Sequence, residues 1–148
     1  AIKLMPPDPS KTDPKQAQQA FNDFSELVRK FPDSRYSTDA RQRMVFLRNA
    51  LAAYETQVAG YYLRRKVFVG AANRAKYVLE HYDKTPALQD ALVIMSEAYL
   101  RMGMKDLAQD SIRVLQTSYP NSSYLGPLNA LLQGQEVDFP LYQGYQGL

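Results

Sequence analysis

Apolar residues recur along much of this chain at alternating spacings of four and three residues, which is the spacing of one face of an α-helix. One such run consists of Phe68, Ala72, Ala75, Leu79 and Tyr82. A longer run consists of Ala40, Met44, Leu47, Leu51, Tyr54, Val58 and Tyr61. The pattern therefore predicts a mostly helical chain in which one helix is much longer than its neighbours.

The longer run predicts a helix of about 29 residues, or roughly 43 Å at 1.5 Å per residue. Ser37 is the expected N-cap, with Asp39 in the first turn. No proline or glycine interrupts the run before Gly60. A period of about 3.5 residues is typical of a coiled-coil-like seam. We therefore expect the extra turns to pack on a distant helix or on a partner.

The chain also repeats itself with an offset of 37 residues. The aligned pairs are Tyr62 with Tyr99, Leu63 with Leu100, Arg64 with Arg101, Ala71 with Ala108, Val78 with Leu115, and Tyr82 with Tyr119. Half of a third copy lies upstream, where Ala20, Phe24, Leu27, Phe31 and Pro32 align with Ala71, Ala75, Val78, Tyr82 and Asp83. Each unit is predicted to be a pair of helices whose small residues allow close approach.

The last unit resembles a tetratricopeptide repeat, because Tyr99, Gly103, Ala108 and Pro120 fall on the motif's tyrosine, turn glycine, alanine and proline. The middle unit departs from the motif at Lys66 and Asp83, so the pattern leaves the geometry of its turn open. The resemblance implies an all-α solenoid, a right-handed αα superhelix of about two and a half repeats with one elongated helix.

Capping signals divide the chain further. Asp13-Pro14 and Thr85-Pro86 each place a capping side chain before a proline at the first helical position. Residues 121–123 are expected to open a short last helix, Leu125 to Leu132. We interpret 1–12 as a linker or the remnant of a preceding repeat, and 13–133 as the repeat domain. The aromatic- and glycine-rich tail, 134–148, is expected to be extended or disordered, or laid into a groove.

The net charge of +3 hides a gradient along the chain. Residues 35–84 carry ten cations and four anions, whereas 85–148 carry three cations and six anions. This asymmetry predicts an acidic partner for the middle of the chain. Binding of a nucleic acid is a weaker interpretation, because these cations spread over several helix faces and no recognition motif accompanies them.

No catalytic constellation stands out in the sequence. The chain has no cysteine, and its one histidine, His81, lies opposite the apolar face of its helix, where we expect a solvated residue. There is no G-x-S-x-G motif and no glycine-rich phosphate loop. We therefore predict that the chain is not an enzyme and that it holds no cofactor and no metal. No apolar run reaches the 18 residues expected of a membrane-spanning helix.

Protein binding is the function that the pattern favours. On helix 68–82, Asn73, Arg74, Tyr77 and His81 share the face turned away from the core. Arginine and tyrosine are enriched among the residues that dominate binding energy. The predicted protein-binding residues are Arg74, Asn73, Tyr77, Tyr62, Arg64, Arg65 and Lys66.

The segments FNDFSELVRKFPDSRYSTDARQRMVFLRN, VAGYYLRRKVFVGAANRAKYVLEHY and PALQDALVIMSEAYLRMGM resemble the C-terminal half of the BamD family. The resemblance covers about residues 13–123. It implies a lipoprotein of the outer-membrane β-barrel assembly machinery, at the periplasmic face of the bacterial outer membrane. It also implies that the family's N-terminal repeats and lipid-bearing cysteine are missing here, so we expect this chain to be a fragment.

The resemblance implies a scaffold rather than an enzyme. In the family the C-terminal repeats dock on the last periplasmic POTRA module of BamA, BamC and BamE are further partners, and N-terminal repeats recognise unfolded outer-membrane proteins. The family's arginine in a V-N-R or A-N-R context matches Ala72-Asn73-Arg74, so Arg74 is expected to pair with a carboxylate of the POTRA module. The alternative is another tetratricopeptide adaptor that binds an unrelated peptide in its concave groove.

Overall fold

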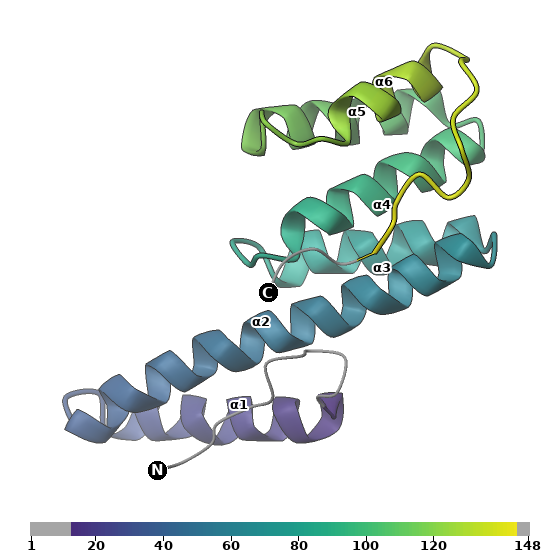
Figure 1. Ribbon diagram of the computed structural model, residues 1–148. Coiled ribbons are helices and arrows are strands. Elements are labelled where there is room, and N and C mark those ends of the chain that lie inside the picture. The colour runs from purple at the N-terminus through teal and green to yellow at the C-terminus, as the bar shows by residue number, and fades with distance from the viewer. Residues whose placement is uncertain (1–12, 145–148) are drawn as a thin grey trace.

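The computed structural model describes residues 13–144, which form six helices and no strand. The helices are α1 (Pro14–Lys30), α2 (Arg35–Arg64), α3 (Phe68–His81), α4 (Leu88–Arg101), α5 (Lys105–Ser118) and α6 (Leu125–Leu132). Each helix packs against the next one in the chain, and α4 also contacts α2 and α6 (Figure 1). The predicted all-α, tetratricopeptide-like repeat fold is confirmed.

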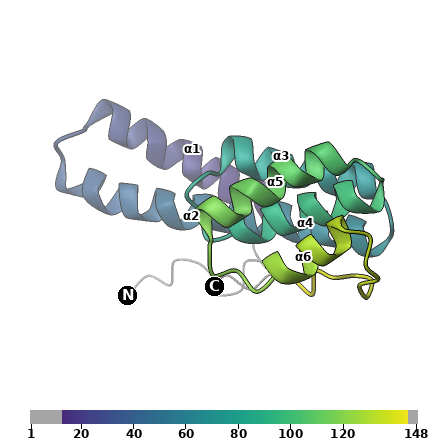
Figure 2. The same ribbon diagram turned by 90° about the horizontal axis from the view of Figure 1, so that it is seen from above.

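The helices form two layers. Seen from above, α1, α3 and α5 lie along one side of the molecule, and α2, α4 and α6 lie along the other (Figure 2). Residues of the main buried cluster come from α2 to α6, from Ala87 before α4, and from Leu141 and Tyr142 beyond α6. Many of them are alanines, such as Ala71, Ala75, Ala91 and Ala98, each with 0% exposure. Small side chains let neighbouring helices approach closely. The short helices of the repeat therefore pack into a dense core.

The long helix is present, but it begins earlier than expected. Helix α2 has 30 residues. Its N-cap is Ser34, whose hydroxyl accepts the backbone N–H of Tyr36 at 3.2 Å. The prediction that Ser37 is the N-cap was wrong, because this side chain is buried in the first turn and donates to the carbonyl of Phe31. The first half of α2 packs on α1 around Leu47, so α1 covers the extra turns.

Two of the three remaining helix starts agree with the sequence. Asp13 caps α1 by accepting the backbone N–H of Lys15 at 2.9 Å, with Pro14 as the first helical residue. The last helix has the expected bounds. The cap predicted at Thr85 was wrong: its hydroxyl donates to the carbonyl of Tyr82 at 2.7 Å, and α4 begins only at Leu88. Thr85 therefore closes the turn after α3 instead of starting α4.

The turns of the two full repeats have the same backbone geometry. Lys66 has φ 61° and Gly103 has φ 75°, and both lie in the left-handed region. In each turn two backbone N–H groups donate to carbonyls three and five residues back, as from Lys66 to Leu63 and from Gly103 to Leu100. The departure from glycine at Lys66 therefore leaves the repeat geometry unchanged.

Beyond α6 the described chain contains no further helix. Residues 135–144 run back over α4 towards α2 (Figure 1). Leu141 and Tyr142 are buried there, with 7% and 1% exposure. The division of the chain at residue 133 stays a prediction. The interpretation of 1–12 as a linker, and the end of the tail at 145–148, lie outside the described residues.

Between residues 13 and 144, no helix combines the length and the apolar character needed to cross a bilayer.

Candidate protein-binding site

A groove of about 450 Å³ opens between α2 and α3. Its lining residues are Glu55 and Tyr62 from α2, and Gly70, Asn73, Arg74 and Tyr77 from α3. Four of the seven residues predicted from the sequence therefore meet at one place. Gly70 has no side chain to fill the groove, and a Cβ there would lie 3.4 Å from the Tyr62 ring.

Arg74 is held in this groove by an ion pair within the chain. Its Nη1 lies 2.8 Å from Glu55 Oε2, and its guanidinium carbon lies 5.9 Å from the centre of the Tyr62 ring. The hydrogen bond to Glu55 raises the pKa of Arg74 above its ordinary value. Because a guanidinium carries five N–H donors and this bond uses one of them, Arg74 is oriented and still able to bind a second carboxylate.

Glu55 is a charged residue of the groove that the sequence analysis missed. The expected partner of Arg74 was a carboxylate of another protein, whereas the nearest acid belongs to α2, 19 residues earlier in the chain. The Glu55 side chain is only 18% exposed and that of Arg74 is 42% exposed. The repeat predicted that α2 and α3 pair, but the pairing alone does not set which residues of the two helices meet.

Aromatic side chains form the wall of the groove next to Arg74. Tyr77 is 43% exposed, and its ring lies 4.1 Å from that of His81 and 5.9 Å from that of Tyr82. His81 is exposed, as expected for a residue opposite the core. Half-exposed tyrosine beside an oriented arginine is a combination typical of protein-binding surfaces.

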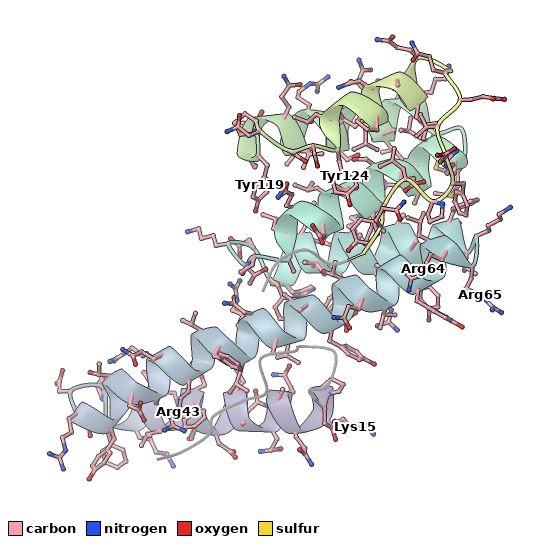
Figure 3. All side chains as sticks on the ribbon, in the orientation of Figure 1. Lys15, Arg43, Arg64, Arg65, Tyr119 and Tyr124 are labelled. Atoms are coloured by element: carbon pink, nitrogen blue, oxygen red, sulfur yellow. The ribbon has the colours of Figure 1, made fainter. Side chains whose placement is uncertain are left out.

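The other three predicted residues lie elsewhere. Arg64 and Arg65 are at the C-terminal end of α2 (Figure 3), and Lys66 is in the turn that follows. The Arg65 guanidinium lies 5.8 Å from the ring of Tyr61, and Lys66 Nζ lies 5.4 Å from the ring of Phe139. None of the three lines the groove that contains Arg74, so the structure divides the predicted site into two surfaces.

Some of the cations of residues 35–84 form ion pairs and hydrogen bonds within the chain. Arg48 donates to the Asp83 carboxylate at 2.8 Å, and to the backbone carbonyls of Asp83 and His81 at 2.6 Å and 3.3 Å. Arg43 lies 2.9 Å from Asp39, one helical turn away. Because these two arginines are paired within the chain, fewer cations of residues 35–84 are available to a partner than the sequence suggests.

Within residues 13–144, no group of three or more acidic or histidine side chains is placed to hold a metal ion.

The fold defines the chain as an all-α protein of tetratricopeptide-like helical repeats. It belongs to the YfiO family of outer membrane lipoproteins, whose family model matches residues 2–115.

Curated relatives of the chain are named outer membrane protein assembly factor BamD. The protein from Xylella fastidiosa strain Temecula1 is 45% identical over 118 residues, which are 80% of this chain and 40% of the relative. That from Neisseria meningitidis serogroup A is 42% identical over 123 residues, 83% of this chain and 46% of the relative. That from Haemophilus influenzae is 41% identical over 99 residues. The chain spans less than half the length of these relatives.

Proposed function

We propose that the chain is part of a non-enzymatic scaffold in outer membrane protein assembly, and that its α2–α3 groove docks on the last periplasmic POTRA module of BamA. The names of its relatives support the assembly role. The observation that supports the docking site is the ion pair of Arg74 with Glu55 inside a groove walled by tyrosines.

The chemistry of the groove suits an acidic, partly apolar partner. Glu55 fixes the guanidinium of Arg74 before binding, so little side-chain freedom is lost when a partner carboxylate arrives. The ring of Tyr77 supplies apolar contact area beside it. Removing one member of a desolvated charge pair at an interface costs on the order of 2–5 kcal/mol, which is enough to make Arg74 decisive for binding.

The wider assignment follows the family. We propose a position at the periplasmic face of the outer membrane, held by a lipid anchor of the full-length protein, with BamC and BamE as further partners. Recognition of unfolded outer-membrane proteins is assigned to N-terminal repeats. This chain should therefore bind the POTRA module but not the targeting signals of unfolded clients.

The competing function is an adaptor that holds a peptide on its inner helices, over residues 54–62 and 92–99. In this chain residues 137–142 already lie against that side, where Tyr142 contacts Gly60 and Glu97. The α2–α3 groove contains no such segment among the described residues. A peptide on the inner helices would first have to displace residues 137–142, so we favour the α2–α3 groove as the docking surface for BamA.

The test is calorimetric titration of the chain with the isolated last POTRA module of the cognate BamA. Arg74→Gln should abolish binding, because it removes the charge and keeps the polar shape. Arg113→Gln is the matched control, since Arg113 makes an exposed ion pair with Asp110 on α5, away from the groove. Binding that survives Arg74→Gln would refute the site. Absence of binding by the unaltered chain would refute the docking function.

A further inference from the structure

The segment 137–142, which we call the strap, crosses the side of the molecule formed by α2 and α4 (Figure 1). It has no helical or strand structure of its own. It is nevertheless held by directed contacts at three places: a carboxylate, a tyrosine pocket and an aromatic subsite. These contacts are those of a peptide in a binding groove.

The first contact is the buried carboxylate of Glu97 on α4. Glu97 has 0% exposure. Its Oε2 accepts the backbone N–H of Leu141 at 2.9 Å, and its Oε1 accepts the backbone N–H of Tyr142 at 2.9 Å. Arg101 supplies the opposite charge, with Nη2 at 3.1 Å from Oε2. A carboxylate that receives two successive N–H groups recognises the backbone of an extended peptide, whatever its side chains.

The second contact is the pocket of Tyr142. The phenol donates to Asp90 Oδ2 at 3.0 Å, and the ring lies 6.1 Å from that of Tyr124. Gly60 of α2 forms the floor, because a Cβ there would lie 3.1 Å from the Tyr142 ring. Burial, together with Asp90, raises the pKa of Tyr142 well above its ordinary value, so the phenol remains a donor. This pocket recognises a tyrosine.

The third contact is an aromatic subsite for Phe139. The Arg101 guanidinium carbon lies 5.1 Å and Lys66 Nζ lies 5.4 Å from the centre of its ring. The rings of Phe68 and Phe139 form a T-shaped pair whose centres are 6.0 Å apart. Arg101 also donates to the carbonyl of Asp138 at 3.2 Å. Lys66 after α2 and Arg101 at the end of α4 therefore contact Phe139, which lies three positions before Tyr142.

The two carboxylates of this face are buried and accept hydrogen bonds from the strap. Asp90 and Glu97 are seven residues apart, which is two turns, so they share one face of α4. Both are buried, at 3% and 0% exposure. A helix that only had to close the core would place apolar side chains at these positions, because a buried carboxylate is unfavourable without its donors.

We propose that this face, formed by Gly60 of α2, Asp90 and Glu97 of α4 and Tyr124 before α6, is a peptide-binding groove. Its ligand is an extended segment with an aromatic residue three positions before a tyrosine. The strap fills the groove in cis, and a separate polypeptide with the same spacing can take its place. The inference is independent of the α2–α3 groove, which other residues line.

The test starts from the folded full chain, with a specific protease site inserted between Gly134 and Gln135, both of which are exposed. After cleavage, the C-terminal fragment should stay bound and should exchange with a labelled synthetic peptide, QEVDFPLYQG. Fluorescence anisotropy reports the exchange. A peptide in which Tyr142 is replaced by Phe should bind about tenfold more weakly or worse, because it leaves Asp90 without the phenol donor.

A chain variant separates recognition from unspecific capture. Glu97→Gln should weaken binding of the peptide by about tenfold or more, whereas Asp110→Asn, an exposed acid on α5, should leave it unchanged. Three outcomes would overturn the proposal: a folded, cleaved chain that does not bind the peptide, equal binding of the Tyr and Phe peptides, or unfolding on cleavage. The last outcome would show that the receptor cannot fold without the strap.

Hydrogen exchange on the intact, uncleaved chain gives an independent readout. A ligand in cis opens without unfolding its receptor, so the amides of Leu141 and Tyr142 should exchange at least tenfold faster than the buried amides of α4. Equal protection of both sets would mean that the strap opens only on global unfolding, and the groove would then not be a binding site.

Discussion

Gly60 lies directly beneath the ring of Tyr142. A Cβ at Gly60 would be 3.1 Å from Tyr142 Cε2, which is closer than nearly all Cβ contacts in proteins. The ring cannot move away freely, since Tyr142 is 1% exposed and its phenol is bonded to Asp90 at 3.0 Å. A glycine near the C-terminal end of a long helix thus contacts a residue 82 positions later.

Gly60→Ala should therefore have opposite effects in two backgrounds. Alanine favours an interior helix position over glycine by about 1 kcal/mol. In the unaltered chain the clash with Tyr142 should outweigh this gain and lower the free energy of unfolding by about 1 kcal/mol. In a Tyr142→Ala background the gain should reappear. Urea unfolding of the four proteins measures the coupling, and equal changes in both backgrounds would contradict the contact.

Gly103→Ala should lower the free energy of unfolding by about 1 kcal/mol, because Gly103 has φ 75° and an L side chain is strained there. Gly126→Ala is the control. It lies in α6 with no φ in the left-handed region and no atom within 4 Å of its Cβ position, so it should be neutral or stabilising. Urea unfolding of both variants measures the difference, and equal losses would show that the turn geometry is wrong.

Most of the fold could be predicted because the sequence carries two independent signals of it. The four-and-three spacing defined the helices, and the offset of 37 residues defined their pairing. Helix starts were less predictable. Ser34 and Ser37 are both good capping residues near the start of α2. The structure distinguishes them, because Ser34 accepts the backbone N–H of Tyr36 and Ser37 donates to the carbonyl of Phe31.

The groove between α2 and α3 could be predicted in part. Asn73, Arg74 and Tyr77 share a helix face, which the periodicity shows directly. Glu55 could not be assigned, because its meeting with Arg74 depends on the register between two helices. The contacts of segment 137–142 could not be predicted either. Leu141 and Tyr142 lie 44 and 45 positions after Glu97, and their segment has no periodic pattern that would indicate what it packs against.

Arg74→Gln should hardly affect stability, even though we propose it abolishes docking. Its ion pair is partly exposed, and such pairs contribute about 0–1 kcal/mol. Arg48→Gln should cost more, about 1–2 kcal/mol, because Arg48 also binds the carbonyls of His81 and Asp83 after α3. Thermal unfolding by circular dichroism compares the two. A larger loss for Arg74→Gln would mean that its ion pair is structural.

Glu97→Gln should lower the free energy of unfolding by about 3 kcal/mol. The amide removes one acceptor and places an NH₂ group against N–H donors, while Arg101 loses its buried counter-charge. Glu26→Gln is the control, because Glu26 forms ion pairs with Arg29 and Lys30 on the surface of α1 and should cost less than about 0.5 kcal/mol. Urea unfolding of both measures the contrast, and similar small losses would argue against a buried, fully bonded carboxylate.

High pH should destabilise the chain through Tyr142. Burial, with a smaller effect of Asp90, raises the pKa of its phenol above the ordinary value of 10.0. Above about pH 10 the unfolded chain releases the proton and the folded chain keeps it, so stability falls as pH rises. Each further pH unit costs about 1.4 kcal/mol from this one group. Below about pH 10 this group contributes no pH dependence.

The measurement is the free energy of unfolding at about pH 8 and about pH 11 for the unaltered chain and for Tyr142→Phe. Burial also raises the pKa of Tyr82 and Tyr119, so both proteins should lose stability at the higher pH. The loss should be smaller for Tyr142→Phe, because phenylalanine has no proton to release. If the two proteins lose the same free energy, Tyr142 ionises freely, and its phenol is then neither buried nor bonded to Asp90.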